Sequence, residues 1–221
     1  REGTRLSFIA TVSSILKEHA GIYDFHLTAA ELMKRSVGLN RLIEVGKINS
    51  MKTAESYVLN SIALGLHRKF GNKVVLTPNS KAILCLRQPG SDSFELSQDE
   101  KIVMLGLLLK IDNEGFLPLL SFLRENGSST LKQMYDQDNW TRIFENEKMK
   151  RLRGAARLHR LVPRLEWCVD LDLVEKTKHY DISPPGKRLL HLASEKTCDP
   201  FDLAIELYFQ ALKTKDSDEL Y

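Results

Sequence analysis

The chain has 221 residues, a formal net charge of +3 and 43% hydrophobic residues. These values are typical of a folded globular protein and exclude a disordered, fibrous or low-complexity chain. The length allows one large domain or two small ones, and it suffices to bury a core without a disulfide or metal staple. No apolar run approaches the roughly 20 residues that a membrane helix needs, so we expect no membrane-spanning segment.

Two features bear on the cellular setting. The chain begins Arg1-Glu2-Gly3, with neither an initiator Met nor the layout of a signal peptide, and we therefore take it as a piece of a longer protein. Its three Cys are odd in number and widely spaced, which favours a reducing compartment. We accordingly expect a cytoplasmic or nucleoid-associated protein.

Charge is distributed in blocks along the chain. The formal charge is +7 over residues 1–90, −6 over 91–147, +6 over 148–198 and −4 over 199–221. Two basic blocks separated by an acidic one favour two similar modules whose surfaces face a polyanion. Chance clustering of ordinary surface charge is the alternative.

The first 88 residues show helical periodicity followed by a strand pattern. Apolar spacing predicts three helices, over 4–19, from Thr28 to about Gly38 and from Asn49 or Ser50 to about Leu64. Thr28 and Glu31 form a capping-box pattern that opens the second helix. Two strand-like runs then flank Gly71-Asn72, a composition suited to a two-residue hairpin turn. Three helices followed by a hairpin is the order of a winged helix.

The rest of the chain continues this plan after a linker at 89–96. Ser97 and Glu100 form a second capping-box pattern that opens an apolar helix. We expect helices at about 102–111, 116–125, 130–137, 148–171 and 200–213, and short strands at 173–175 and 179–182. Pro163 interrupts the 148–171 pattern, because a proline costs a helix interior about 3 kcal/mol, and we expect two helices that meet near Val162.

An internal repeat supports the two modules. The segment from Leu76 to Leu84 aligns with the segment from Ile182 to Leu190 at a constant offset of 106. Each copy contains a strand end, a hydroxyl that can cap the next turn or helix, a proline and an apolar pair. Each copy also comes after an amphipathic helix and a Leu-x-Leu step.

These motifs resemble the wings of tandem winged-helix proteins, namely prokaryotic transcription regulators and the recognition part of a type IIS restriction enzyme. The resemblance is architectural and implies a mostly α fold with small β-hairpin wings. It implies winged-helix units at 1–88 and 97–194, a linker at 89–96, and a C-terminal helix and acidic tail at 195–221. Winged helices also serve as protein-interaction modules, as in the kleisin-binding subunits of chromosome-organising complexes, so the fold alone does not decide the function.

The most basic segment, from Lys148 to Arg164, contains seven Lys or Arg and no acid. Five of its residues recur every three or four positions, so that one helix face would present them as an exposed basic stripe: Lys150, Arg153, Arg157, Arg160 and Arg164. Arg151 adjoins this stripe. Arginine suits phosphate because its planar fork donates two parallel hydrogen bonds. Internal salt bridges and contact with another protein are the alternatives.

The corresponding helix of the first unit presents residues that suit base edges and phosphate oxygens, namely Asn49, Lys52, Thr53 and Ser56. A merely polar exposed face is the alternative for this helix. The first hairpin carries the cations Arg68, Lys69 and Lys73, which favour contact with the minor groove or the DNA backbone. The second hairpin carries Lys176 and Lys178 as their counterparts.

The sequence contains no P-loop, no G-x-G-x-x-G and no G-x-S-x-G. Cys85, Cys168 and Cys198 lack the C-x-x-C spacing of a zinc site. We therefore expect no enzyme activity, no cofactor and no metal. A nuclease whose catalytic part lies outside this chain is a weaker option.

The last predicted helix, Phe201 to Leu212, is apolar nearly all round. Because a terminal helix buries one face on its own domain, we expect the other face to form a homodimer or to contact the parent protein. Burial between the two modules is the alternative.

We therefore expect non-catalytic binding of duplex DNA through the helices and basic wings of both units. The competing prediction is a protein-interaction scaffold built of tandem winged helices. The basic stripe discriminates between them. Exposure to solvent favours DNA, and pairing with acids from residues 91–147 favours the scaffold.

Overall fold

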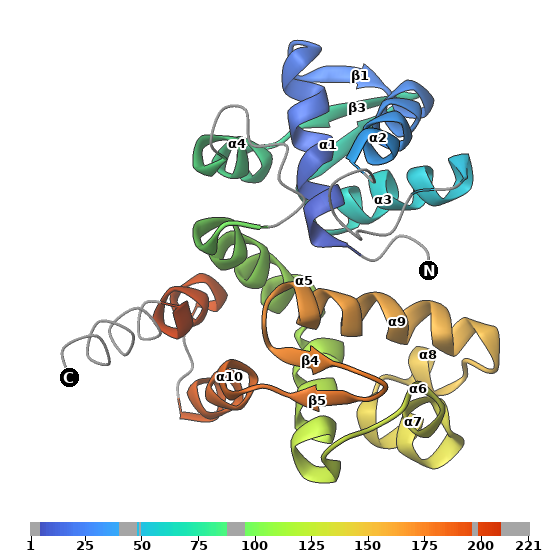
Figure 1. The fold of residues 1–221 in the computed structure, drawn as a ribbon, viewed down its shortest axis with the longest axis vertical. Helices are drawn as coiled ribbons and strands as arrows, with labels where there is room; N and C mark the ends of the chain where they lie inside the picture. The colour runs from blue at the N-terminus through green and yellow to red at the C-terminus, as the bar shows by residue number, and fades with distance from the viewer. Residues whose placement is uncertain (1–4, 40–47, 49, 88–95, 196–198, 209–221) are drawn as a thin grey trace. The chain divides into compact units, whose positions relative to one another are not determined.

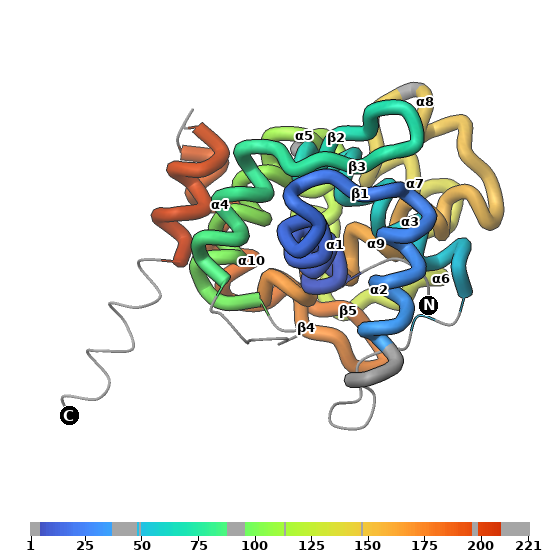
Figure 2. Tube along the Cα trace, turned by 90° about the horizontal axis from the view of Figure 1, so that it is seen from above, coloured from blue at the N-terminus to red at the C-terminus, as the bar shows by residue number. Residues whose placement is uncertain are grey.

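The computed structural model describes residues 5–39, 48, 50–87, 96–195 and 199–208. The chain divides into two compact units, Arg1–Val103 and Met104–Tyr221. Figures 1 and 2 show that each unit consists mainly of helices and contains one small sheet, which is antiparallel. The mostly α fold with small β-hairpins that the sequence predicts is confirmed at this level.

Unit 1 consists of helices that pack around a hairpin-based sheet. In chain order its elements are α1 (Leu6–Glu18), β1 (Ile22–Asp24), α2 (Phe25–Leu39), α3 (Met51–Ala63), β2 (His67–Phe70), β3 (Lys73–Leu76) and α4 (Pro78–Leu86). The strands form an antiparallel sheet in the order β1-β3-β2. Helices α1, α2 and α3 pack against one another, and α1 contacts β3 (Figures 1 and 2). The sequence did not predict β1.

Helix α1 forms the centre of unit 1 because its apolar residues recur at helical spacing over most of its circumference. Phe8, Ile9 and Val12 are at most 2% exposed. The helix ends at a left-handed turn in which Ala20 and Gly21 have φ of +56° and +85°. The Gly21 N–H donates to the Leu16 carbonyl at 2.7 Å, which satisfies one of the free carbonyls at the helix end.

The start of α2 differs from the sequence prediction. Asp24 caps the helix, because its Oδ1 accepts hydrogen bonds from the backbone N–H groups of His26 at 2.9 Å and Leu27 at 3.1 Å. Thr28, the predicted cap, lies inside the helix and is buried, and its hydroxyl donates to the Asp24 carbonyl at 2.7 Å. The capping box predicted at Thr28 was wrong, since Asp24 supplies the acceptor one turn earlier.

The hairpin of unit 1 has the predicted two-residue turn. Gly71 has φ of +58°, which suits the first position of a type II′ turn, and the strands pair from His67 opposite Leu76 to Phe70 opposite Lys73. Its first residue, His67, is 2% exposed, and His67 Nε2 lies 3.0 Å from the hydroxyl of Ser13 on α1. Burial lowers the pKa of His67 to about 3, so a neutral imidazole anchors the base of the hairpin.

Helix α5 (Gln98–Asn126) begins in unit 1 with the predicted capping box. The Ser97 N–H donates to Glu100 at 2.9 Å, and the Glu100 N–H donates to the Ser97 hydroxyl at 3.2 Å. Glu100 Oε1 also lies 3.1 Å from Nε of Arg87, and both side chains are buried. This ion pair joins the start of α5 to the end of α4. The boundary of the compact units therefore follows Val103, whereas residues 89–95 of the expected linker lie outside the described residues.

Unit 2 contains most of α5 and the elements after it. They are α6 (Leu131–Tyr135), α7 (Gln137–Ile143), α8 (Glu147–Lys150), α9 (Ala155–Asp170), β4 (Val174–Lys176), β5 (Tyr180–Ile182), α10 (Pro184–Glu195) and a helix over residues 200–208. Asp112, with φ of −136°, kinks α5 between the two segments that the sequence predicts as separate helices. Strands β4 and β5 pair antiparallel near the predicted positions.

The interruption expected at Pro163 occurs nine residues earlier. Gly154 has φ of +48°, a left-handed conformation that a right-handed helix cannot include, and α9 starts after it. Pro163 lies within α9 and removes one backbone donor without ending the helix. Leu161 and Leu165, on either side of it, are fully buried, and their packing offsets the lost hydrogen bond.

The predicted repeat is confirmed by matching hydrogen bonds in the two units. The Leu66 N–H donates to Ser61 at 3.0 Å, and the Leu173 N–H donates to Cys168 at 2.8 Å. The Thr77 hydroxyl donates to the carbonyl of Gly65, the residue before Leu66, at 3.1 Å. The Ser183 hydroxyl donates to the carbonyl of Asp172, the residue before Leu173, at 2.5 Å. Those residues, Gly65 and Asp172, both have positive φ. Ser129 pairs with Tyr180, so β5 also has neighbours on both sides, as β3 has.

Candidate nucleic-acid interface

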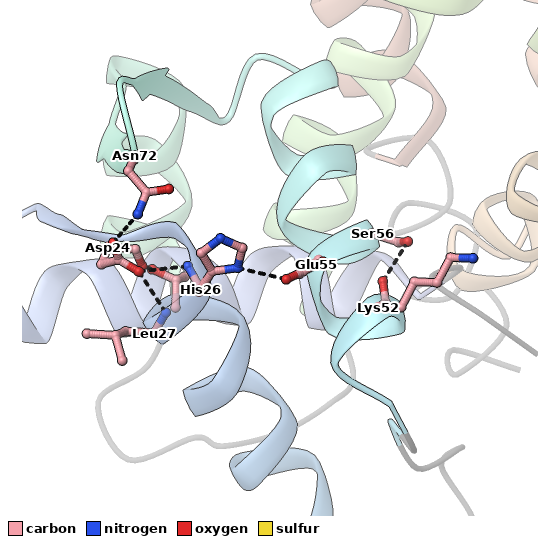
Figure 3. Close-up of polar contacts among 8 residues, drawn as sticks. Asp24, His26, Leu27, Lys52, Glu55, Ser56 and Asn72 are labelled. Carbon is pink, nitrogen blue, oxygen red and sulfur yellow. Dashed lines mark hydrogen bonds and ion pairs between the residues drawn. The ribbon is translucent and has the colours of Figure 1, made fainter.

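Helix α3 presents two of the predicted contact residues (Figure 3). Lys52 is exposed, and Ser56 is half-buried and donates its hydroxyl to the Lys52 carbonyl at 2.9 Å. Thr53 is only 8% exposed, and its hydroxyl lies 2.9 Å from that of Ser50, the residue that caps the helix. The prediction that Thr53 faces outward was therefore wrong. Asn49 lies outside the described residues.

A polar network that the sequence did not predict ties α2, α3 and the hairpin together (Figure 3). His26 Nδ1 lies 2.8 Å from Oε1 of Glu55, which joins α2 to α3. The Asn72 amide donates to Asp24 Oδ2 at 2.5 Å, which joins the hairpin turn to the start of α2. An Asp directly before an apolar helical pattern could have identified the cap. No sequence signal links His26 to Glu55, which lies 29 residues away.

The hairpin holds its three predicted cations in exposed positions. Arg68, Lys69 and Lys73 are all exposed, and Lys69 Nζ lies 4.6 Å from the centre of the Phe25 ring. Phe70, next to the turn, is 74% exposed. In the part of the chain that the structure describes, Arg68 and Lys73 have no ion-pair partner, so their charges remain available to an anion.

Arg157, at the middle of the predicted basic stripe, is an internal residue. Its side chain is 4% exposed, and it donates to the carbonyls of Leu152 at 2.8 Å and Tyr135 at 2.9 Å and to the side chain of Gln137. The guanidinium also lies 5.4 Å from the centre of the Trp140 ring. The prediction that Arg157 is exposed was wrong, because these groups of α6 and α7 enclose it.

Arg164 also turns inward within unit 2. Its Nε and Nη2 donate to the two carboxylate oxygens of Asp112 at 2.6 and 2.7 Å, a bidentate pair at the kink of α5. A Cβ at Gly115 would lie 2.8 Å from Arg164 Nε, so the glycine makes room for the guanidinium. The two side chains are 14% and 21% exposed. Arg164 thus pairs with an acid from residues 91–147, the outcome that the sequence analysis associated with a scaffold.

The other residues of the basic segment remain closer to the surface. Arg151, Arg153 and Arg160 are exposed, and Lys150 is half-buried. Arg153 turns back onto its own segment, donating to the carbonyls of Lys150 at 2.8 Å and Leu152 at 3.0 Å. The five predicted residues therefore do not form one continuous exposed stripe.

The hairpin of unit 2 carries less available charge than that of unit 1. Lys176 forms an ion pair with Glu166, a buried acid that also accepts a hydrogen bond from the Tyr180 hydroxyl at 3.0 Å. Lys178 is exposed at the turn. Only one of the two predicted cations of this hairpin is thus directed to solvent among the described residues.

The last helix packs on unit 2 along one face of its described part, residues 200–208. Leu203, Ala204 and Leu207 are buried, whereas Ile205 is 43% exposed. The ring of Phe201 lies over Gly106, where a Cβ would be 2.3 Å from a ring carbon. Residues 209–212 lie outside the described residues, so the homodimer or parent-protein contact through 201–212 stays a prediction.

Metal-binding clusters, membrane-spanning helices and reactive cysteines would each point to another kind of function. They contain no group of three or more His, Cys, Asp or Glu residues that could hold a metal ion. No helix among them is long and apolar enough to span a membrane. The Cys168 thiol is fully buried, and burial raises its pKa, which makes it an unreactive core residue.

Comparison of the chain with protein-family models, with curated proteins and with solved structures finds no match. The case for a function therefore rests on the residues of this chain and their geometry.

Proposed function

We propose that the chain binds duplex DNA without catalysing a reaction, and that unit 1 supplies the main contact surface. In this proposal the two units are tandem winged helices, α3 is the recognition helix of unit 1 and the β2–β3 hairpin is its wing. The chain serves as the DNA-recognition part of a larger protein or complex, such as a regulator or a defence or restriction system.

The topology of unit 1 supports this proposal. Helix α3 follows α2 and leads directly into a hairpin whose second strand pairs with β1. A helix of about 10–12 Å diameter fits the major groove of B-DNA, which is about 12 Å wide. A hairpin that follows such a helix contacts the adjacent backbone or the minor groove.

The observation that carries the proposal is the availability of cations on these two elements. Lys52 on α3 and Arg68 and Lys73 on the hairpin are exposed. Strands β2 and β3 contain no acidic residue. Such charges bind phosphates and supply much of the affinity of a DNA-binding protein. Arg151, Arg160 and Lys178 of unit 2 are also exposed, and together they add at most one further phosphate contact.

A protein-interaction scaffold is the second candidate, and one observation favours it. Arg157 and Arg164 use their guanidinium groups inside unit 2, so the segment whose composition best suits DNA stabilises the fold instead. In this alternative, unit 2 is a structural module whose surface binds other proteins.

A binding titration with duplex DNA over a series of salt concentrations tests the proposal. We expect the affinity of the full chain for a long duplex to fall by orders of magnitude between low and moderate salt, because Lys and Arg side chains that bind phosphates release counterions from the DNA. Absence of binding at low salt would overturn the proposal and favour the scaffold.

A further inference from the structure

We propose that Phe70 is an aromatic wedge that enters a base-pair step of the bound duplex from the minor groove. This inference rests on the proposed DNA-binding function and adds to it a residue with a defined role. It assigns to the hairpin tip a contact with the bases themselves, in addition to the phosphate contacts of its cations.

The exposure of Phe70 is the first observation behind this inference. Phe70 is 74% exposed, a larger fraction than for the other exposed large hydrophobic residues that the structure describes, such as Leu27 at 52% and Leu59 at 50%. A ring that stays in water gives nothing to the stability of the unit. It becomes useful when a partner covers it, and a stack of bases offers flat apolar faces to an aromatic ring.

The register of the hairpin places cations around this ring. Alternate residues of a strand point to opposite faces of the sheet, and Val74 is buried on the inner face. Phe70, its cross-strand partner Lys73 and Arg68 therefore share the outer face. An apolar ring with two cations on the same face suits a duplex groove, in which bases lie between two rows of phosphates.

The hairpin also has the rigid support that a wedge needs. Asn72, in the turn next to Phe70, is fixed to α2 from both its side chain and its backbone. Its amide donates to Asp24, and its carbonyl accepts from the Phe25 N–H at 2.8 Å. A hairpin tip held in this way keeps its conformation when the ring is inserted between two base pairs, so it can separate them.

The test uses the full chain and duplexes that carry 2-aminopurine, a base whose fluorescence rises when it is unstacked. We expect wild-type protein to raise this fluorescence, and Phe70→Ala to abolish the rise and weaken binding about tenfold. Phe70→Leu should retain most of both effects, because leucine also serves as a wedge. Ile111→Ala, which removes a 48% exposed residue elsewhere, is the matched control and should behave as wild type.

Salt dependence separates the wedge from the phosphate contacts. Phe70→Ala should leave the negative slope of log affinity against log salt unchanged, whereas Lys73→Ala should reduce its magnitude by about 0.9. If the chain binds DNA but Phe70→Ala changes neither affinity nor fluorescence, the wedge is overturned and the DNA-binding proposal stands. If the wild-type chain binds no DNA, the proposed function fails together with the wedge.

Discussion

The two units build the same hydrogen-bonded framework at the base of their hairpins and use their cations in opposite ways. In unit 1, Arg68 and Lys73 remain exposed on the hairpin. In unit 2, Arg157 and Arg164 lie inside the fold, bound to carbonyls and to Asp112. On the corresponding hairpin of unit 2, Lys176 pairs with Glu166, so the same framework carries exposed cations in one unit and a paired cation in the other.

The density of cations in a sequence is therefore a poor guide to a DNA-binding face. The segment around Arg157 has the highest density of positive charge in the chain, yet the packing of α6 and α7 encloses its central residue. The hairpin of unit 1 has fewer cations, but Arg68, Lys69 and Lys73 are all exposed among the described residues.

The largest expected effect comes from removing the buried guanidinium of unit 2. Arg157→Ala should lower the free energy of unfolding of unit 2 by about 3 kcal/mol, because it leaves the carbonyls of Leu152 and Tyr135 without their charged donor. Both tryptophans, Trp140 and Trp167, belong to unit 2, so tryptophan fluorescence during chemical denaturation reports this unit alone.

Arg160→Ala is the matched control for this experiment, since Arg160 lies on the same helix and is exposed. It should change the stability by no more than about 0.5 kcal/mol. Equal and small effects of the two substitutions would contradict the internal role of Arg157.

The ion pair at the kink of α5 gives the next largest effect. Arg164→Ala should destabilise unit 2 by about 2 kcal/mol, because it leaves the half-buried Asp112 carboxylate without its partner. Combining it with Asp112→Asn should recover part of the loss, and a double-mutant cycle followed by tryptophan fluorescence measures this coupling. Strict additivity of the two substitutions would contradict the internal pairing of Arg164.

Acid should weaken unit 1 through His67. The pKa of His67 is about 3 in the folded chain, below its ordinary value of 6.5, because the ring is buried. The unfolded chain therefore binds the proton first as the pH falls, and this residue's contribution is intact above pH 6.5 and is lost between pH 6.5 and 3. The loss is up to about 1.4 kcal/mol per pH unit.

His67→Gln isolates this contribution from those of the other titrating groups. Urea denaturation followed by circular dichroism at pH 7 and at pH 4.5 should show a smaller loss of stability in the variant than in the wild type. Identical pH dependence of the two proteins would mean that His67 is accessible to protons in the folded state.

Most of the fold could be predicted from the sequence, because apolar spacing and turn residues act locally. The turn at Gly71-Asn72 and the capping box at Ser97 are examples in which neighbouring residues alone determine the structure. The prediction at Pro163 failed, since it weighed the cost of a proline and not the packing of Leu161 and Leu165 or the left-handed backbone of Gly154.

The candidate interface could be predicted only in part. The exposure of the hairpin cations could be predicted, because they lie beside a two-residue turn. Thr53 is buried and its hydroxyl contacts the Ser50 cap, which the pattern of exposed polar residues did not indicate. The burial of Arg157 depends on α7, an element that the sequence did not predict. Contacts between residues far apart in the chain, such as His26 with Glu55, leave no periodic signal.

The assignment of DNA binding to unit 1 is tested by comparing the two units as sources of phosphate contacts. The measurement is the slope of log affinity for duplex DNA against log salt, for the wild type and two triple variants. Lys52→Ala/Arg68→Ala/Lys73→Ala should reduce the magnitude of this negative slope by about 2 to 3, since each lost phosphate contact is worth about 0.9. Arg151→Ala/Arg160→Ala/Lys178→Ala should reduce it by less than about 1. An unchanged slope in the unit 1 variant, or a larger loss in the unit 2 variant, would contradict the assignment of DNA binding to unit 1.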